Sequence, residues 1–386
     1  MGSGVSMSDL PDHIDRDAAR TIFSSQYDDH IFDSLKGTDG LVTKSTLLNF
    51  LGKKYAIRGS IIHSLSFSDI EVIGDGAIVY GYGGVIEKVL DLSKDGNSDE
   101  LSRVDEILDF SGKLIIPGFV DAHVHAPQYA FTGTGMDLPL LKWLETYTFP
   151  CESHFSDPAF AESVYRKAVR KHLKSGTTFA SYFATIYNST NKLLVKIIQE
   201  YGQRAYIGKV SMDRNAPNFY IEQSAQSIDD NEEFIRHVLS LTPHGVAFLA
   251  QVDANVSTKN DLKLLNKLDT PVLLPVITPR FVPSCTKALM TKLGDLAEKY
   301  KVPVQSHLCE SRNEIKWCLE LHPEEQSYTD IYNSCGLLTD RSYMAHCCYC
   351  TPHERDLLRR TKTGIVHCPC SNFMIMSGTA GYLVTD

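Results

Sequence analysis

The sequence has no long apolar run. None approaches the ~20 residues of a membrane-spanning helix, and the N-terminus lacks the apolar segment of a secretory signal. Basic residues are also in the minority, because 38 Lys and Arg against 47 Asp and Glu give a formal net charge of −9. Binding to a phosphate backbone requires an excess of cations, so we expect no nucleic acid and no membrane as partners. These absences predict a cytosolic, cytoplasmic protein.

Cysteine is missing from the first 150 residues, although the chain has 10 cysteines. Without a signal peptide we expect reduced thiols rather than a disulfide framework. Several gather late in the chain, namely Cys347, Cys348, Cys350, Cys368 and Cys370. A four-cysteine structural zinc site is one hypothesis. We do not favour it, because the neighbouring His346 and His367 fall at predicted strand ends, and the sequence assigns no role to this cluster.

The chain does contain enough apolar sequence for a core. Its 386 residues are 43% hydrophobic and 22% charged, which suits one large α/β domain with a small satellite. Residues 1–54 are predicted to form a partly helical extension, because 17–35 and 43–53 have helical apolar spacing. The glycine turn between them resembles half of a calcium-binding loop. The chelating positions would hold Leu35, Gly37, Asp39 and Thr46, so we expect no calcium site.

Residues 55–112 are predicted to form part of a small β-sandwich. The β-rich runs at 55–59, 76–80 and 83–89 are separated by turns, which favours an antiparallel sheet. Residues 92–106 are polar and are predicted to form a surface loop.

From residue 113 to residue 386, candidate strands alternate with candidate helices. The strands are 114–124, 177–184, 205–211, 272–277, 303–308, 343–347 and 364–368. The helices are 157–174, 190–201, 228–241, 284–300 and 353–362. Repeated β-then-α units predict an α/β fold with a parallel sheet, either open or closed into a (β/α)8 TIM-like barrel that lacks its last strand. Gly176 and Gly364 are predicted to end helices ahead of strands.

The first of these strands ends in two histidines. His123 and His125 lie on the same strand face, because successive side chains point to opposite faces. Two neutral imidazoles at a strand end are a start for a transition-metal site. The pair alone is equally compatible with polar residues at a solvated strand end.

Further polar residues follow later strands. Arg280 follows the fourth, His307 ends the fifth and His346 ends the sixth. Active sites of such barrels form at the carboxyl ends of the strands, so these residues are predicted to converge with the first two histidines. A metal ion held there would suit hydrolysis of a carbonyl, an amidine or an ester.

Other side chains are predicted to act on a substrate. Glu310, three residues after His307, is placed to pass a proton to a leaving amine, or else is a helix N-terminal acid favoured by the dipole. Arg280 offers donors to a carbonyl oxygen on a planar ring, with a surface salt bridge as the alternative. Gln128 would add hydrogen bonds, and Phe281 an aromatic wall.

Several segments resemble the amidohydrolase superfamily. Residues 117–125 resemble its first-strand signature. Resemblance to the guanine deaminase branch rests on 125–129, 137–144, 147–150, 202–205, 278–281, 305–307 with Glu310, 344–346 and 367–372. Asp-Leu-Pro-Leu-Leu at 137–141 and Thr-Pro-Arg-Phe at 278–281 are specific to that branch.

This resemblance implies a metal-dependent hydrolase barrel that converts guanine to xanthine and ammonia in purine catabolism, with one zinc ion per chain. The residues that would bind or flank zinc are His123, His125, His307 and His346. The residues that would contact the purine are His125, Gln128, Arg280, Phe281, His307 and Glu310. Glu310 and His346 would be catalytic, and a homodimer is expected for a complete chain.

The sequence departs from the family pattern near its end. The family has a metal-binding, catalytic Asp after an eighth strand, for which Asp386 is the candidate. We expect instead that residues 380–386 begin the helix before that strand, and that 242–268 is an insertion. Two alternatives stay open: a truncated, impaired form that acts only through binding, or a related amidohydrolase that deaminates another heterocycle.

Overall fold

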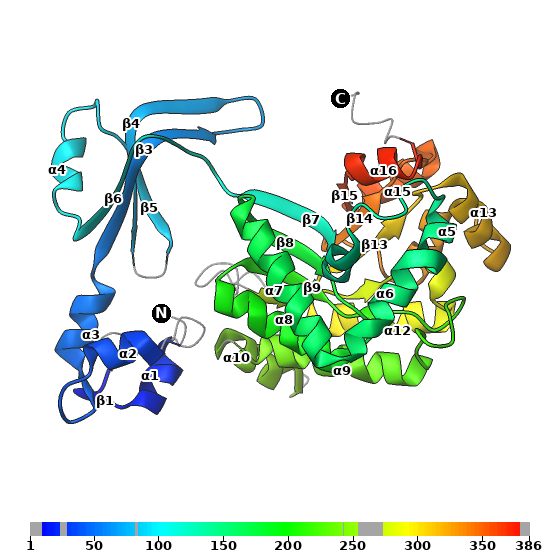
Figure 1. Ribbon diagram of the computed structural model, residues 1–386, viewed down its shortest axis with the longest axis horizontal. Helices are drawn as coiled ribbons and strands as arrows, with labels where there is room; N and C mark the ends of the chain where they lie inside the picture. The colour runs from blue at the N-terminus through cyan, green and yellow to red at the C-terminus, as the bar shows by residue number, and fades with distance from the viewer. Residues whose placement is uncertain (1–9, 24–28, 82–83, 242, 254–272, 379–386) are drawn as a thin grey trace. The chain divides into compact units, whose positions relative to one another are not determined.

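The computed structural model describes residues 10–23, 29–81, 84–241, 243–253 and 273–378 (Figure 1). Contacts divide the chain into two compact units. The first comprises Met1–Gly118 with Leu241–His244 and Lys267–Asp269, and the second comprises Phe119–Ser240, Gly245–Asn266 and Thr270–Asp386. Each unit is described by itself.

The first unit begins with a small helical part. Its elements are β1 (His13–Ile14), α1 (Arg16–Phe23), α2 (Asp29–Leu35), β2 (Val42–Thr43) and α3 (Lys44–Leu51). The two short strands pair antiparallel, and Ile14, Phe32 and Leu47 are buried between these elements. Thr43 caps α3 by accepting a hydrogen bond from the backbone N–H of Thr46.

The first unit also contains a four-stranded sheet. Its elements are β3 (Lys54–Ser64), β4 (Ile70–Gly81), β5 (Ile86–Asp91), α4 (Asn97–Leu101) and β6 (Glu106–Ile115), with strand order β5-β4-β3-β6. Strands β3, β4 and β5 are antiparallel, as the turns predict, whereas β6 pairs parallel to β3. The prediction of one strand over 114–124 is wrong, because 116–118 separate β6 from the next strand.

The second unit is a parallel (β/α) barrel. Its strands are β7 (Phe119–His125), β8 (Thr177–Phe183), β9 (Arg204–Gly208), β10 (Val210–Ser211), β11 (Leu273–Pro275), β12 (Thr278–Pro279), β13 (Val304–Leu308), β14 (Ser342–His346) and β15 (Gly364–Val366). One group has the order β7-β8-β9-β11, another the order β13-β14-β15, and the short strands β10 and β12 pair with each other. A parallel bridge from Ile277 to Val304 joins the first group to the second. Within the described ranges, β7 and β15 each lie at the end of their group, and no further strand pairs with either of them on the open side.

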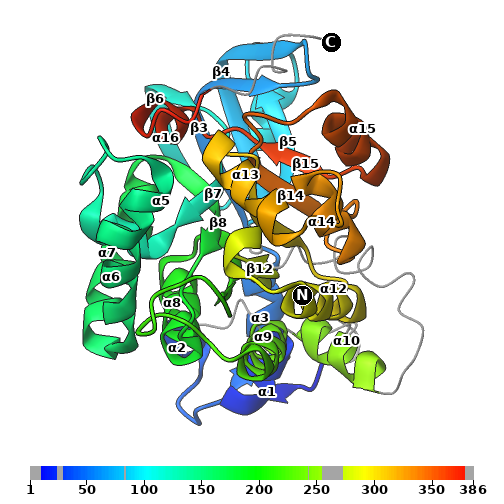
Figure 2. The ribbon, with the colours of Figure 1, turned by 90° about the vertical axis from the view of Figure 1, so that its right-hand side faces the viewer.

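Helices follow the strands and lie outside them (Figure 2). The connections to the strands are α7 (Pro158–Lys174), α8 (Asn188–Tyr201), α9 (Ser224–Leu239), α10 (Pro243–Asp253), α12 (Lys287–Tyr300), α13 (Arg312–Leu321), α14 (Tyr328–Ser334), α15 (Pro352–Thr361) and α16 (Pro369–Met374). Gly176, with φ of +84°, follows α7 as predicted. Gly364 does not end a helix, because Lys362 with φ of +58° caps α15 and Gly364 begins β15. Helix α10 covers part of the expected insertion, and 254–268 lies outside the described residues.

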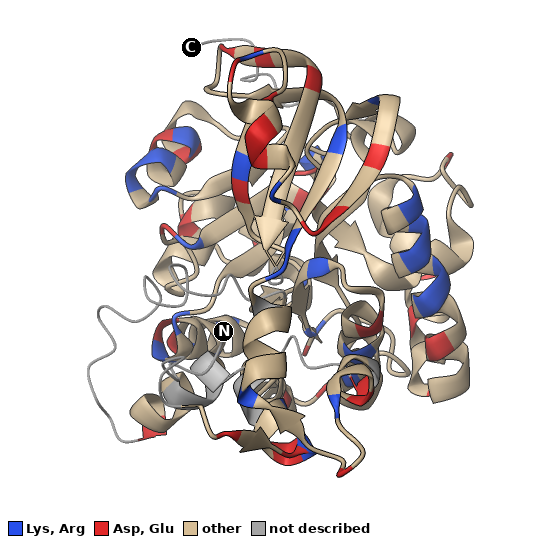
Figure 3. Cartoon of the chain, turned by 90° about the vertical axis from the view of Figure 1, so that its left-hand side faces the viewer, with Lys and Arg blue, Asp and Glu red and all other residues tan. Residues whose placement is uncertain are grey.

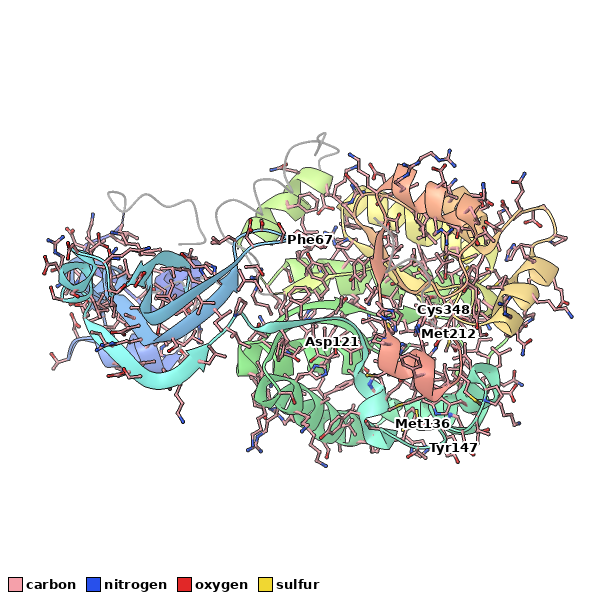
Figure 4. All side chains as sticks on the ribbon, turned by 90° about the horizontal axis from the view of Figure 1, so that it is seen from above. Phe67, Asp121, Met136, Tyr147, Met212 and Cys348 are labelled. Carbon is pink, nitrogen blue, oxygen red and sulfur yellow. The ribbon has the colours of Figure 1, made fainter. Side chains whose placement is uncertain are left out.

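The segment between β7 and α7 forms one edge of the site described below. It consists of η3 (Ala126–Phe131), α5 (Leu140–Trp143), the π-helical turn η4 (Leu144–Thr148), α6 (Phe149–Ser153) and η5 (His154–Ser156). A Cβ at Gly135 would lie 2.2 Å from Tyr147 Cε2, so Tyr147 packs directly over this glycine, beside Met136 (Figure 4).

Lys and Arg residues are interspersed with Asp and Glu over the described elements (Figure 3). Within the described ranges, the structure contains no helix that is both long and apolar enough to span a bilayer.

Candidate active site

Four histidine rings gather at the carboxyl ends of three barrel strands. His123 and His125 come from β7, His307 from β13 and His346 from β14. The His123 ring centroid lies 5.2 Å from His125, 4.7 Å from His307 and 5.3 Å from His346. Phe183, the last residue of β8, stacks on His125 at 4.4 Å. The predicted convergence of the four histidines is therefore observed.

Two of these histidines face each other through their Nε2 atoms. His125 Nε2 and His307 Nε2 are 3.0 Å apart, and the Nδ1–H of His307 donates to the Arg280 carbonyl at 2.6 Å. That bond leaves the lone pair of His307 on Nε2. Two ligands at ordinary zinc–nitrogen distances from one ion would be separated by roughly 3.3 Å. The spacing therefore fits a shared metal ion.

The electrostatics of the cluster also suit a cation. Burial, reinforced by neighbouring imidazoles and Arg280, lowers the pKa of His123 and His125 well below the usual range. Burial, with His346 nearby, does the same to the pKa of His307. The rings are therefore neutral near neutral pH, the form that binds a metal. The Nδ1 atom of His125 is buried and has no hydrogen-bond partner among the described residues, so the cluster leaves one imidazole nitrogen unsatisfied.

In the described part of the chain, two groups of three residues could each hold a metal ion, because the donor atoms within each group all lie within 4.8 Å of one another. One comprises His123, His125 and His307, and the other His123, His346 and Cys368. Both share His123. The five clustered cysteines of the sequence do not form a common set, since Cys347, Cys348 and Cys350 are buried while Cys370 is exposed. The four-cysteine hypothesis therefore receives no support.

Left-handed backbone conformations mark the ends of β13 and β14. Cys309 has φ of +50°, His346 of +73° and Cys347 of +51°. The Cys347 N–H donates to the Leu308 carbonyl at 2.8 Å, which joins the two strand ends. Non-glycine residues adopt this conformation only where surrounding contacts enforce it, and they concentrate at functional sites. Strand pairing thus holds His346 in a conformation that a free chain would avoid.

Glu310 lies beside His346 rather than in the first turn of a helix. Its Oε1 is 3.3 Å from His346 Nδ1, and both side chains are 4% exposed. Helix α13 begins at Arg312, and the acid of its capping box is Glu314, which accepts from the backbone N–H groups of Glu310 and Ser311. Burial raises the pKa of Glu310, so the protonated form is favoured in the absence of a cation.

Arg280 is buried at 2% exposure, which excludes the surface salt bridge. Its Nη1 donates to Glu152 Oε2 at 2.5 Å and its Nη2 to Glu152 Oε1 at 3.0 Å. Gln128, Arg280, Phe281, His307, Glu310 and the other histidines all line one cavity of about 1120 Å³. Leu140, Trp143 and Leu144 from the β7–α7 segment add apolar walls. The cavity therefore brings together every described residue that the sequence predicted for the site, and Asp386 lies outside the described residues.

Sequence reasoning assigned no role to several residues that support this site. Asn372 Oδ1 accepts from His346 Nδ1 at 2.7 Å, and Tyr332 OH donates to the His307 carbonyl at 2.9 Å. Glu152 and Phe183 were also missed. Glu152 lies two residues after the resembling segment 147–150, which was the only available signal for it.

Comparisons with known proteins agree with this geometry. The model of the Amidohydrolase family matches residues 114–382. Guanine deaminase of Dictyostelium discoideum is 40% identical over 332 residues, which are 83% of this chain and 68% of that protein. Guanine deaminase of Mus musculus is 36% identical, over 84% of this chain and 67% of that protein.

A solved structure is similar as well. The crystal structure of guanine deaminase from C. acetobutylicum with bound guanine in the active site superposes with a TM-score of 0.72 and 34% identity, over 84% of this chain and 70% of that one. The chain thus spans about two thirds of the length of these relatives.

Proposed function

Because the chain belongs to the amidohydrolase family, in its guanine deaminase branch, we propose that it hydrolyses guanine to xanthine and ammonia with one zinc ion. The observation that carries this proposal is the convergence of four imidazoles, a buried carboxyl group and a buried guanidinium on one cavity. The histidines supply metal donors, the carboxyl group a proton carrier, and the guanidinium a donor for a ring carbonyl.

The proposed metal ligands are His123, His125 and His307, with His346 beside them. Asp386, which lies outside the described part of the chain, is not included among them, because residues 380–386 are expected to begin the helix before an eighth strand. When bound, a divalent ion supplies a Lewis acid, the chemistry by which hydrolases activate water near neutral pH. Zinc is the proposed ion because neutral imidazoles are among its preferred ligands.

Glu310 is the proposed proton carrier. Its carboxylate takes one proton from water, whose oxygen bonds to the ring carbon that carries the amino group, and passes this proton to a ring nitrogen. It then carries the second proton, from the new hydroxyl group, to the amino group, and the carbon–nitrogen bond breaks to release ammonia. The backbone N–H of Glu310 donates to Glu314 Oε2 at 2.9 Å, which fixes the chain at this position. His346, whose Nδ1 is held by Asn372 and lies 3.3 Å from Glu310 Oε1, is placed to stabilise the ionised Glu310 carboxylate and to orient the attacking water.

Gln128, Arg280 and Phe281 are proposed to hold the purine, together with His125 and His307. Arg280 retains N–H groups beyond those that Glu152 accepts, since a guanidinium carries more donors than one carboxylate can engage. Phe281 lines the same cavity and is 5% exposed, so its ring is available as an apolar wall. We further propose a cytosolic location and a homodimeric complete protein.

Turnover of guanine by the purified full-length protein tests this function. We expect the ultraviolet absorbance of guanine to fall as xanthine and ammonia appear in equal amounts, with one zinc per chain by elemental analysis. Turnover of another aminopurine or an aminopyrimidine, with guanine inert, would support a related amidohydrolase instead. Stoichiometric zinc without any turnover would support a form that acts only through binding.

A further inference from the structure

Glu152 and Arg280 form a fully buried ion pair at the wall of the cavity. Glu152 is 0% exposed and Arg280 is 2% exposed, and two hydrogen bonds join them in a parallel fork. The Tyr220 hydroxyl donates to Glu152 Oε2 at 2.8 Å. Such a pair offsets its desolvation only when the geometry is close and the remaining lone pairs are satisfied, and both conditions hold here.

Local structure delivers both the carboxylate and an aromatic support to the guanidinium. Glu152 and Phe149 lie three residues apart on α6, so their side chains share one face of that helix. The Arg280 guanidinium carbon lies 5.2 Å from the centre of the Phe149 ring. Helix α6 follows the π-helical turn η4, a rare conformation that is frequent at functional sites.

The pairing determines which ligand charge the cavity favours. A buried guanidinium without a partner attracts an anion strongly, because the low dielectric leaves its charge unscreened. Paired with Glu152, Arg280 keeps oriented N–H donors but contributes no net charge. Oriented donors without net charge suit the neutral carbonyl of a purine lactam rather than a carboxylate.

We propose that Glu152 is the positioning and specificity-determining residue for Arg280, and that it selects neutral purine lactams over anionic ligands. This rests on the proposed function. A merely structural ion pair would stabilise the fold without affecting ligand charge preference, so the two roles are separable by measurement.

The experiment compares the binding of two probes to the zinc-loaded protein by titration calorimetry. Hypoxanthine is the neutral lactam, and purine-6-carboxylate is the anion. In the Glu152→Gln variant, the affinity ratio should shift toward the anion by on the order of tenfold or more, the scale of removing one partner from a buried charge pair. An unchanged ratio, with only a lower melting temperature, would overturn the proposal.

The chain offers a matched control in Lys209 and Glu222. Lys209 Nζ lies 2.5 Å from Glu222 Oε1, the side chains are 0% and 7% exposed, and neither residue lines the cavity. Glu222→Gln should lower the melting temperature and leave the ratio of the two affinities unchanged. An equal shift in this control would also overturn the proposal.

A second variant covers the case in which Glu152→Gln does not fold. The double change Glu152→Gln with Arg280→Gln removes both charges, which is often tolerated better than an unpaired buried ion. This double variant should bind hypoxanthine more weakly than the wild type, and its affinity for purine-6-carboxylate should not rise. A rise in that affinity would refute the role of the Arg280 charge. Intact probe binding without guanine turnover would refute the proposed function and not the role of Glu152.

Discussion

Replacement of Glu310 by Gln is the sharpest test of the chemistry. The amide has the same size as the carboxyl group and can still contact His346 Nδ1, which lies 3.3 Å from Glu310 Oε1. The backbone bond from Glu310 to Glu314 does not involve the altered side chain. The change therefore removes proton transfer and little else.

The expected loss follows from that single role. General acid–base groups contribute about 10² to 10⁴-fold, so kcat of Glu310→Gln should fall by at least ~10²-fold, or about 2.7 kcal/mol of transition-state stabilisation. Zinc content should stay near that of the wild type, because the proposed metal ligands are histidines that this change leaves intact. Michaelis constants should change much less than kcat, because the amide keeps the shape of the cavity.

Steady-state kinetics with guanine, combined with elemental analysis, give both quantities. Glu320→Gln is the control, since Glu320 is on the neighbouring helix α13 and its side chain is 60% exposed. Turnover of Glu310→Gln within about threefold of the wild type, at full zinc content, would refute proton transfer by this residue.

The raised pKa of Glu310 adds a pH dependence to the same variant. A carboxyl group whose pKa is higher in the folded state contributes stability at low pH and loses it as the pH rises above 4.5 through the raised pKa. Gln cannot ionise. In metal-free protein, the melting temperature of Glu310→Gln should therefore exceed that of the wild type increasingly from about pH 5 to about pH 8, the interval between the ordinary and the raised pKa. A constant difference would contradict burial of an ionisable group.

Three further predictions concern the metal, the substrate and the packing of Tyr147 over Gly135. Cobalt substituted for zinc should show no thiolate charge-transfer band if histidines alone bind it; a band that Cys368→Ser removes and Cys370→Ser retains would instead assign Cys368 as a ligand. Arg280→Ala should raise the Michaelis constant for guanine at least about tenfold, and an unaltered constant would argue against the contact. Gly135→Ala should lower stability by about 1 to 3 kcal/mol in chemical denaturation, because its φ is +67° and the added Cβ would meet Tyr147; equal stability would show that Tyr147 can move.

The sequence by itself determined the first half of the proposed metal site. His123 and His125 point to one side because side-chain alternation along a strand is set by local covalent geometry. The alternation of strands and helices predicted a parallel sheet, either open or closed into a barrel, and either form places His307 and His346 at the same edge, since parallel strands end together. Each of these inferences needs only local periodicity and one rule of topology.

Predictions of strand and helix ends were wrong where contacts with a neighbouring segment outweighed the local sequence pattern. Strand β6 (Glu106–Ile115) forms because β3 offers it a pairing edge, although the sequence pattern predicted no strand between residues 92 and 113. Gly364 begins a strand because Lys362 already ends α15 in the left-handed conformation. Propensity cannot anticipate these outcomes, because strand pairing and helix ends depend on what lies alongside.

Only the tertiary structure decided which partners the buried polar groups find. Glu152 and Arg280 are 128 residues apart in sequence, and Asn372 is 26 residues from His346. A buried charge or imidazole must be satisfied, but composition and spacing do not say by which residue. That choice depends on which side chains the completed fold brings within hydrogen-bond distance. The histidines were therefore readable from the sequence, whereas the residues that orient them and set the charge of the cavity were not.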